Sequence, residues 1–261
     1  MPETVLVPAL GKPATGVIVT GGAAGIGFAS ARALAAVGRS VALWDVDGRA
    51  ARVSASQIAE ESGVTVHAEE IDLLGIDAFA DALGRSRSAL GNLGGLVHAA
   101  GIVDTGSIEG ITPQNWEEGI GVHLRALAFL VQALHSDMAA NPGSAIVAIA
   151  SINATLGNGL NPVYSAAKGG MLSLVRSLAD RLALDAIRIN AVSPGQINTA
   201  MMRPAIDALP EGHFERRILL ERLGTPEEIG RVVRFLLSAE ASYITAAELV
   251  VDGGNISSQR Y

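Results

Sequence analysis

Short apolar runs alternate with longer periodic segments along almost all of this 261-residue chain. Seven runs have the length of strands, and most are continuously apolar, which is typical of strands buried on both faces of a parallel sheet. They cover residues 16–20, 40–45, 64–71, 94–100, 144–151, 187–193 and 248–254. The helix-length segments between them are 26–37, 49–61, 76–90, 113–140, 162–184 and 226–238. This repetition predicts an α/β fold: a doubly wound, mainly seven-stranded parallel sheet with helices on both faces.

No proline- or serine-rich linker and no internal repeat divides the sequence, so we expect a single domain over residues 14–261. Residues 1–13 lack this periodicity and are expected to form a short N-terminal extension. One other long stretch without a clear period, about 197–221, follows the sixth run. Long aperiodic insertions of this kind usually carry function, and we expect a lid here.

The composition excludes several kinds of function. The absence of cysteine excludes disulfides, thiolate nucleophiles and cysteine metal sites. A net charge of −7 offers no basic surface for nucleic acid or anionic lipid. Mean hydropathy is +0.36, but no run of about 18 apolar residues is long enough to span a membrane. The first residues do not form a secretory signal. We therefore expect a cytoplasmic protein with no nucleic-acid or membrane partner.

A glycine-rich loop, TGGAAGIG (20–27), joins the first predicted strand to the first helix. Gly21, Gly25 and Gly27 permit a tight turn and let the backbone approach a pyrophosphate at the helix N-terminus, where free amides and the helix dipole favour anions. The spacing differs from the commoner G-x-G-x-x-G fingerprint. We interpret the loop as part of a dinucleotide site, and a plain turn is the alternative.

Acidic residues end the second and third predicted strands at the same edge of the sheet. Asp45 can accept both hydroxyls of an adenosine ribose and would repel a 2′-phosphate, while Ala23 and Ala24 supply no cation for such a phosphate. The expected cofactor is therefore NAD. Asp72 could face an adenine. A solvated loop aspartate is the alternative at both positions.

A hydroxyl, a phenol and an ammonium group converge on this carboxyl edge. Ser151 ends the fifth run, and Tyr164 and Lys168 are four residues apart, on one face of a helix. A fixed ammonium group favours phenolate and lowers the tyrosine pKa from its ordinary value of about 10. The pair could therefore provide an acid–base catalyst, although an isolated Y-x-x-x-K is more often an ordinary pair of helical neighbours.

Taken together, these motifs resemble the short-chain dehydrogenase/reductase family, in its compact single-domain form. The resemblance covers about residues 14–256 and rests on TGGAAGIG, Ser151 with Y-x-x-x-K, SPGQINT (193–199) and ELVVDGGN (248–255). It implies a Rossmann-type fold. It also implies that Tyr164 is the general acid/base, that Lys168 lowers its pKa and holds the nicotinamide ribose, and that Ser151 binds the substrate oxygen.

The same resemblance implies a wider cofactor site. Pro194 and Gly195 would turn the chain against the nicotinamide, and the Ile197 backbone and Thr199 hydroxyl would engage its carboxamide. The other implied cofactor-binding residues are Gly21, Ala24, Gly25, Ile26, Gly27, Asp45, Asp72, Leu73, Ala100, Gly101, Tyr164 and Lys168. His67, His135 and His213 show no spacing suited to a metal, so we expect no catalytic metal.

Two positions depart from the family pattern. Members usually carry Asn-Asn-Ala-Gly where this chain has His98-Ala99-Ala100-Gly101, so another group or a water molecule must satisfy the backbone there. His123 in GVHLRA takes the place of a fourth catalytic residue, usually asparagine. It is either a titrating member of a proton relay or a neutral packing residue. His98 is expected to be structural.

We expect an NAD(H)-dependent oxidoreductase that interconverts a secondary alcohol and a ketone. An NADPH-dependent 3-oxoacyl thioester reductase is opposed by Asp45, and a catalytically idle NAD-binding protein is opposed by the intact Ser151, Tyr164 and Lys168. The substrate walls are expected at 152–161, 103–106 and 197–221. Amides there suit a hydroxyl-rich substrate (Asn153, Asn158 and Asn161), whereas apolar side chains suit an apolar one (Leu156, Leu160, Met201, Met202 and Leu209).

A homotetramer is also expected. Two long predicted helices, 113–140 and 162–184, carry apolar residues beyond a single stripe, which gives them a second surface to bury. These residues are Leu124, Leu127, Phe129, Leu172 and Leu178. In the resembling family, the two helices pair across a two-fold axis.

Overall fold

A computed structural model describes residues 15–257. It contains one seven-stranded sheet with the order β3-β2-β1-β4-β5-β6-β7, in which all neighbouring strands are parallel. The strands are β1 (Gly16–Thr20), β2 (Val41–Asp45), β3 (Val66–Glu70), β4 (Leu93–His98), β5 (Ala145–Ile149), β6 (Arg188–Pro194) and β7 (Glu248–Val251). The predicted doubly wound fold is confirmed. The predicted N-terminal extension, 1–13, lies outside the described residues.

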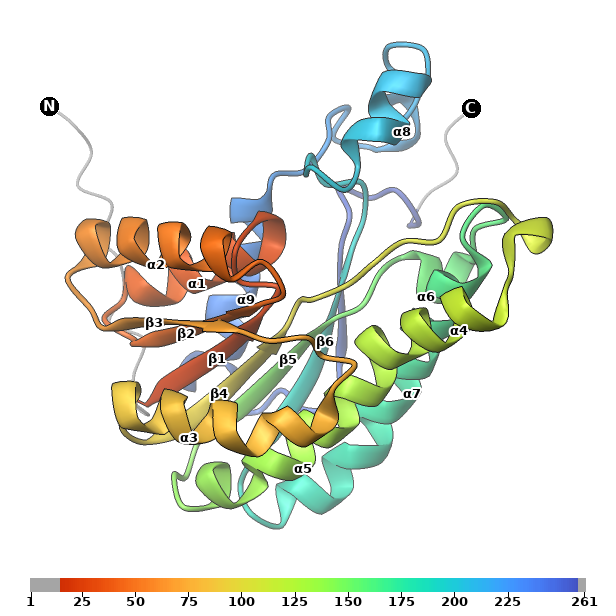
Figure 1. The fold of residues 1–261 in the computed structure, drawn as a ribbon. Helices are drawn as coiled ribbons and strands as arrows, with labels where there is room; N and C mark the ends of the chain where they lie inside the picture. The colour runs from red at the N-terminus through yellow and green to blue at the C-terminus, as the bar shows by residue number, and fades with distance from the viewer. Residues whose placement is uncertain (1–14, 258–261) are drawn as a thin grey trace, which may run out of the picture.

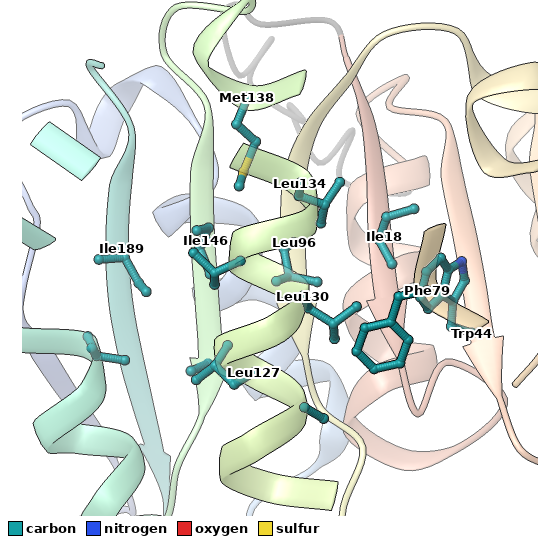
Figure 2. Close-up of a cluster of buried hydrophobic side chains, with 14 of the residues drawn as sticks. Ile18, Trp44, Phe79, Leu96, Leu127, Leu130, Leu134, Met138, Ile146 and Ile189 are labelled. Carbon is teal, nitrogen blue, oxygen red and sulfur yellow. The ribbon is translucent and has the colours of Figure 1, made fainter. Parts of the chain in front are cut away.

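Helices cover both faces of the sheet (Figure 1). One face carries α1 (Gly25–Ala35), α2 (Gly48–Ser62) and α9 (Pro226–Leu236), and the other carries α3 (Phe79–Leu90), α5 (Ala126–Ala139) and α7 (Pro162–Ala183). Successive residues of a strand therefore enter different cores: Val17 and Val19 pack with the first group of helices, and Ile18 with the second. Figure 2 shows the second core, where Leu127, Leu130 and Leu134 of α5 lie over the strands.

The strand order reverses next to β1, and this reversal places the site. The chain leaves β1 toward β2 on one side, and leaves β4 toward β5 on the other. The loops that follow β1 and β4 therefore diverge at the carboxyl ends of adjacent strands. In open α/β sheets, ligands bind in the crevice formed at this kind of point.

The prediction of one continuous helix over 113–140 was wrong. The structure divides it into α4 (Pro113–Ile120), a π-helical turn (Gly121–Arg125) and α5. The carbonyl oxygens of Val122 and His123, within this turn, accept hydrogen bonds from Nε2 of His98 at 3.1 and 3.0 Å. A π-turn interrupts the regular backbone ladder, and here a side chain from a neighbouring strand satisfies two of its carbonyls.

The segment between β6 and α9 is closed at its neck and projects from the sheet. A bridge pairs Ile197 with Gly224, and the amides of Asn198 and Gly224 donate to Gly224 and Gln196 at 2.9 Å. Beyond this neck lie α8 (Arg203–Ala208) and a 3₁₀ turn (Glu215–Arg217). In Figure 1, α8 stands well away from the sheet. No helix among residues 15–257 is long and apolar enough to cross a bilayer.

Candidate active site

The loop between β1 and α1 is packed too tightly for a side chain at Gly21 and Gly27. A Cβ on Gly27 would lie 2.0 Å from the carbonyl oxygen of Gly21, and one on Gly21 would lie 2.8 Å from the Ala100 backbone. Gly21 and Gly25 also have positive φ values of 64° and 54°, which favour glycine. The loop therefore depends on its glycines, and Ala100 lies directly beside it.

The N-terminus of α1 is open to an anion. Ala24 occupies the N-cap position without a side-chain hydrogen bond, and no acidic residue lies in the first turn. Neither the N-cap residue nor the first turn therefore supplies a side-chain acceptor for the first amides of this helix, and the helix dipole favours negative charge at this end. The loop and the uncapped helix together fit a pyrophosphate.

Asp45, at the end of β2, contacts the glycine loop directly. One carboxylate oxygen accepts the backbone amide of Ala23 at 3.0 Å, and the other accepts that of Asp47 at 3.1 Å. These bonds fix the carboxylate beside the loop, where a ribose linked to a bound pyrophosphate would lie. Arg49 and Arg52 lie in the first turns of α2, and Arg52 pairs with Glu70 at 3.5 Å.

Other predicted cofactor residues differ in what they can offer. Asp72 is exposed and binds the amide of Leu74 at 2.9 Å, so its carboxylate shapes its own turn. The Leu73 side chain is buried in the core, which leaves only its backbone for a ligand. Ala100 and Gly101, by contrast, follow β4 at the switch point and are partly exposed.

The chain that follows β6 returns to the glycine loop. A Cβ on Gly25 would lie 3.7 Å from the Thr199 side chain, so Thr199 sits at the N-terminus of α1. Pro194 ends β6, and Gly195 packs so closely on Asp252 that a Cβ there would lie 2.7 Å away. Ile197 is buried at the neck of the projecting segment. A hollow of about 590 Å³ opens beside Thr199, lined by Asn198, Thr199, Ala200, Arg203, Pro204 and Asp207.

The structure brings Ser151, Tyr164 and Lys168 together at the carboxyl ends of β4 and β5. Tyr164 and Lys168 lie one turn apart on α7, and the Lys168 ammonium is 5.5 Å from the centre of the Tyr164 ring. Lys168 is 3% exposed and donates a short hydrogen bond to the carbonyl oxygen of Ile149. The Ser151 hydroxyl accepts the backbone amide of Asn153 at 3.1 Å.

The predicted lowering of the Tyr164 pKa by Lys168 is not found. Burial is the largest influence and raises the pKa of Tyr164, while a hydrogen bond with the Ser151 side chain acts in the opposite direction. Burial also lowers the pKa of Lys168 to about 7. Near neutral pH the lysine is therefore only partly charged, and it stabilises a phenolate less than a permanent cation would.

His98 lies where members of the family usually carry asparagine, and its ring connects the neighbouring backbone segments. Its Nε2 donates to the carbonyls of Val122 and His123, so its Nδ1 must accept from the Thr20 hydroxyl, 3.0 Å away. Thr20 Oγ1 in turn accepts the amides of Ala99 and Ala100 at 3.2 and 3.3 Å. Burial, aided by Lys168, lowers the pKa of His98 to about 4, so this connector is neutral.

His123 is fully buried, edge-on to Tyr164, with ring centres 5.3 Å apart. Its Nε2 lies 2.8 Å from the carbonyl oxygen of Ile102, and its Nδ1 has no hydrogen-bond partner among residues 15–257. The ring also packs on Gly101, where a Cβ would lie 2.4 Å from Cε1. Burial and the charge of Lys168 lower the pKa of His123 well below 6.5. This environment favours the neutral packing role over a titrating relay.

Sequence reasoning missed the role of Asp104. Its carboxylate accepts the backbone amides of Val163 and Tyr164, at 3.2 and 2.8 Å, and its own carbonyl oxygen accepts the Asn161 side-chain amide. Asn161 is the residue before α7, yet its side chain gives no cap to that helix. Asp104 therefore caps α7 from a distant loop. Aspartate favours such positions, but nothing in the sequence indicates a partner so far along the chain.

The described part of the chain, residues 15–257, holds no group of three or more histidine or acidic side chains that could bind a metal ion. The chemistry on offer at the crevice is therefore that of a hydroxyl, a phenol and an amine beside a glycine loop. A doubly wound sheet with these groups at its switch point is typical of α/β proteins that bind a dinucleotide.

Comparisons with known proteins identify the family within this class. A family model described as enoyl-(acyl carrier protein) reductase matches residues 21–255. A probable galactose dehydrogenase of Rhizobium meliloti is 33% identical over 92% of this chain and 94% of its own, and an acetoacetyl-CoA reductase of the same organism is 37% identical over 91% and 96%. The chain belongs to the short-chain dehydrogenase/reductase family of oxidoreductases.

A solved relative has the same fold. The structure of L-sorbose reductase from Gluconobacter frateurii, in complex with NADPH and L-sorbose, superposes with a TM-score of 0.88 at 26% identity. The alignment covers 97% of this chain and 100% of the other. These relatives act on sugars and on a coenzyme A thioester, so family membership does not by itself select a substrate class.

Proposed function

We propose that this protein is an NAD(H)-dependent oxidoreductase that interconverts a secondary alcohol and a ketone. The observation that carries the proposal is the placement of Ser151, Tyr164 and Lys168 at the switch point, on the same edge as the glycine loop. Loss of any of these three groups would favour the alternative of a catalytically idle dinucleotide-binding protein.

Proton transfer is assigned to Tyr164. Its phenol gives a proton to the carbonyl oxygen in reduction and takes it back from the hydroxyl in oxidation. The Ser151 hydroxyl would orient the same substrate oxygen, and Lys168 would hold the ribose next to the nicotinamide. The nicotinamide, when bound, supplies or accepts the hydride. Burial keeps Tyr164 protonated, which prepares it to act as the donor in ketone reduction.

NAD, not NADP, is proposed as the cofactor. The carboxylate of Asp45 is held against the Ala23 amide, 3.0 Å away, where it would meet the adenosine ribose. It can accept the ribose hydroxyls, and it would repel a 2′-phosphate. NADPH in the L-sorbose reductase complex is a property of that relative. The acetoacetyl-CoA reductase relative keeps a thioester reductase as the second candidate, which the Asp45 carboxylate opposes if NADPH is required.

Residues 14–261 are proposed to act as one domain, with 197–221 as a lid over the crevice. The closed neck at Ile197 and Gly224 supports the proposed lid, because the projecting segment can move as a unit about this neck. Gly21, Gly25 and Gly27 with Ala24 and Ile26 would hold the pyrophosphate, and Thr199 lies close enough to Gly25 to reach the nicotinamide half. The adenine and the ribose attached to it would be bordered by Asp72, Leu73, Ala100 and Gly101. Pro194, Gly195 and Ile197 would border the nicotinamide.

A homotetramer in the cytoplasm is proposed. Leu127 and Leu172 belong to the core, and Leu124 and Leu178 are partly buried against it. Of the five residues that suggested a second apolar surface, Phe129 remains exposed at 40%, and Trp116 on α4 adds another exposed aromatic at 42%. Light scattering should give four times the 26.8 kDa chain mass. A monomer at micromolar concentration would overturn this part of the proposal.

Absorbance at 340 nm tests the activity directly. The purified chain would be assayed with NAD and NADP against secondary alcohols, polyols and sugars, and with NADH and NADPH against the matching ketones and acetoacetyl-CoA. We expect turnover of secondary alcohols or ketones, with the higher kcat/KM for NAD(H). A preference for NADPH would contradict the proposal that Asp45 selects NAD. Absence of turnover with every compound would contradict the proposal that the protein is an enzyme.

A further inference from the structure

Two segments border Tyr164 and are tied together. Residues 102–111 follow β4, and residues 152–161 connect Ser151 to α7. Asp104 caps α7 at the backbone of Val163 and Tyr164, and the Ser107 amide donates to the carbonyl oxygen of Leu160 at 3.4 Å. These bonds hold both segments at the start of α7, the helix that carries Tyr164, and Ile102 binds His123, whose ring lies edge-on to that of Tyr164. We take the exposed side chains of the two segments to form part of the entrance to the site.

Several polar side chains in these segments are already engaged with the backbone. Asn158 Oδ1 accepts the Leu160 amide at 3.0 Å, the Asn161 amide donates to the Asp104 carbonyl, and the Asp104 carboxylate binds the start of α7. At least part of the hydrogen-bonding capacity of Asn158, Asn161 and Asp104 is therefore used within the loops themselves. A hydroxyl-rich substrate would find fewer partners here than the sequence suggests.

Most large apolar side chains of the same segments are exposed, and Ile152 is the buried exception. The exposed fractions are 74% for Ile108, 66% for Leu160 and 60% for Leu156, with Ile102, Ile111 and Val103 at 42%, 40% and 38%. Single exposed aliphatic residues are ordinary, but six in two tied segments at the mouth of a site form an apolar rim. We use "apolar rim" for Ile102, Val103, Ile108, Ile111, Leu156 and Leu160.

We infer that the substrate of this site has an apolar body, an alkyl chain or carbocycle that lies against the apolar rim, with its reacting oxygen at Ser151 and Tyr164. This inference rests on the proposed oxidoreductase function and specifies its substrate class. An alkyl chain gains from leaving water beside Leu156 and Leu160. A sugar in the same place would exchange its hydrogen bonds to water for contact with aliphatic carbon, which is unfavourable.

A homologous series of secondary alcohols tests the substrate class. With NAD in excess, kcat/KM should rise about three- to fourfold for each added methylene from 2-butanol to 2-octanol, as expected for burial of a CH₂ group. Hexoses and hexitols should react more slowly than 2-hexanol. A flat series, or a hexose preferred over 2-octanol, would overturn the inference.

Substitutions in the apolar rim locate the effect. Leu160→Asn and Leu156→Asn should each lower kcat/KM for 2-octanol by about tenfold, because several apolar contacts are lost. They should leave 2-butanol, which is too short to cover the rim, within about twofold. Val53→Asn, at a 64% exposed valine on α2, is the matched control and should change neither substrate.

The outcomes separate the inference from the proposed function. Turnover confined to sugars, or an equal effect of Leu160→Asn on 2-butanol and 2-octanol, would overturn the apolar substrate and leave the oxidoreductase standing. Failure of every alcohol, ketone and sugar with both dinucleotides would overturn the proposed function, and the inference with it. Circular dichroism and NADH binding of each variant verify that the fold is intact.

Discussion

The carboxylate of Asp104 accepts a 2.8 Å hydrogen bond from the backbone amide of Tyr164. Tyr164 is the third residue of α7, and the N3 amide is one that an N-cap side chain normally satisfies. A residue from the loop after β4 therefore takes the place of a cap that Asn161 does not provide. The start of the helix that carries the phenol is thus fixed by a loop that also borders the site.

This contact predicts that Asp104 positions Tyr164. Asp104→Ala should lower kcat about tenfold, because a small displacement of the phenol weakens proton transfer, and should cost about 1 kcal/mol of unfolding free energy. Asp104→Asn keeps an acceptor oxygen and should recover most of the turnover. Steady-state kinetics would be measured well below the unfolding transition, together with NADH binding. An alanine variant with kcat within twofold of the parent would show that Asp104 only stabilises the loop.

The buried Lys168 predicts how stability depends on pH. Its pKa is lowered by burial from 10.5 to about 7, so between these values the unfolded chain binds a proton that the folded chain does not. The contribution of this group to stability therefore rises with pH across that window, by at most about 1.4 kcal/mol per unit.

Lys168→Met isolates this contribution, because it removes the titrating group and keeps most of the volume. The variant should be more stable than the parent near pH 7, and its advantage should shrink by about 1 kcal/mol per unit as pH rises to 9. Urea unfolding without dinucleotide, at several pH values, gives both free energies. A difference that stays constant with pH would mean that Lys168 keeps its ordinary pKa in the folded protein.

His123 is predicted to take no part in the pH dependence of turnover. Burial, aided by the charge of Lys168, lowers its pKa well below 6.5, so we expect the ring to be neutral at and above neutral pH. Log kcat against pH for His123→Asn should therefore superimpose on the parent profile after a uniform scale factor. The variant should also be somewhat less stable, since asparagine leaves a void beside Gly101. An acid limb near pH 6.5 in the parent that disappears in the variant would place His123 in the proton relay.

The parts of the site that the sequence predicts are those encoded locally. The glycine loop, Asp45 and Ser151 lie at the ends of apolar runs, and parallel strands bring such ends to one edge of the sheet. Tyr164 and Lys168 share a helical face because they are four residues apart. The seven strands and their helices follow from periodicity in the same way, within a few residues at each end.

The features that the sequence does not predict depend on contacts between distant segments. The π-turn at 121–125 exists where His98 of β4 can donate to its carbonyls, and periodicity alone indicates one straight helix. Asp104 caps a helix that begins far along the chain. The direction of the Tyr164 pKa also depends on burial, which a four-residue spacing cannot reveal.

Tyr164→Phe tests the central claim most directly, because it removes one oxygen atom and leaves the ring. We expect kcat for alcohol oxidation to fall by about three orders of magnitude, as for loss of a general acid/base, while NADH still binds within about threefold of the parent. Tyr243→Phe, at a fully exposed tyrosine (104%), is the matched control and should retain parental kcat. Turnover of Tyr164→Phe within tenfold of the parent would contradict the assignment of Tyr164 as the proton donor and acceptor.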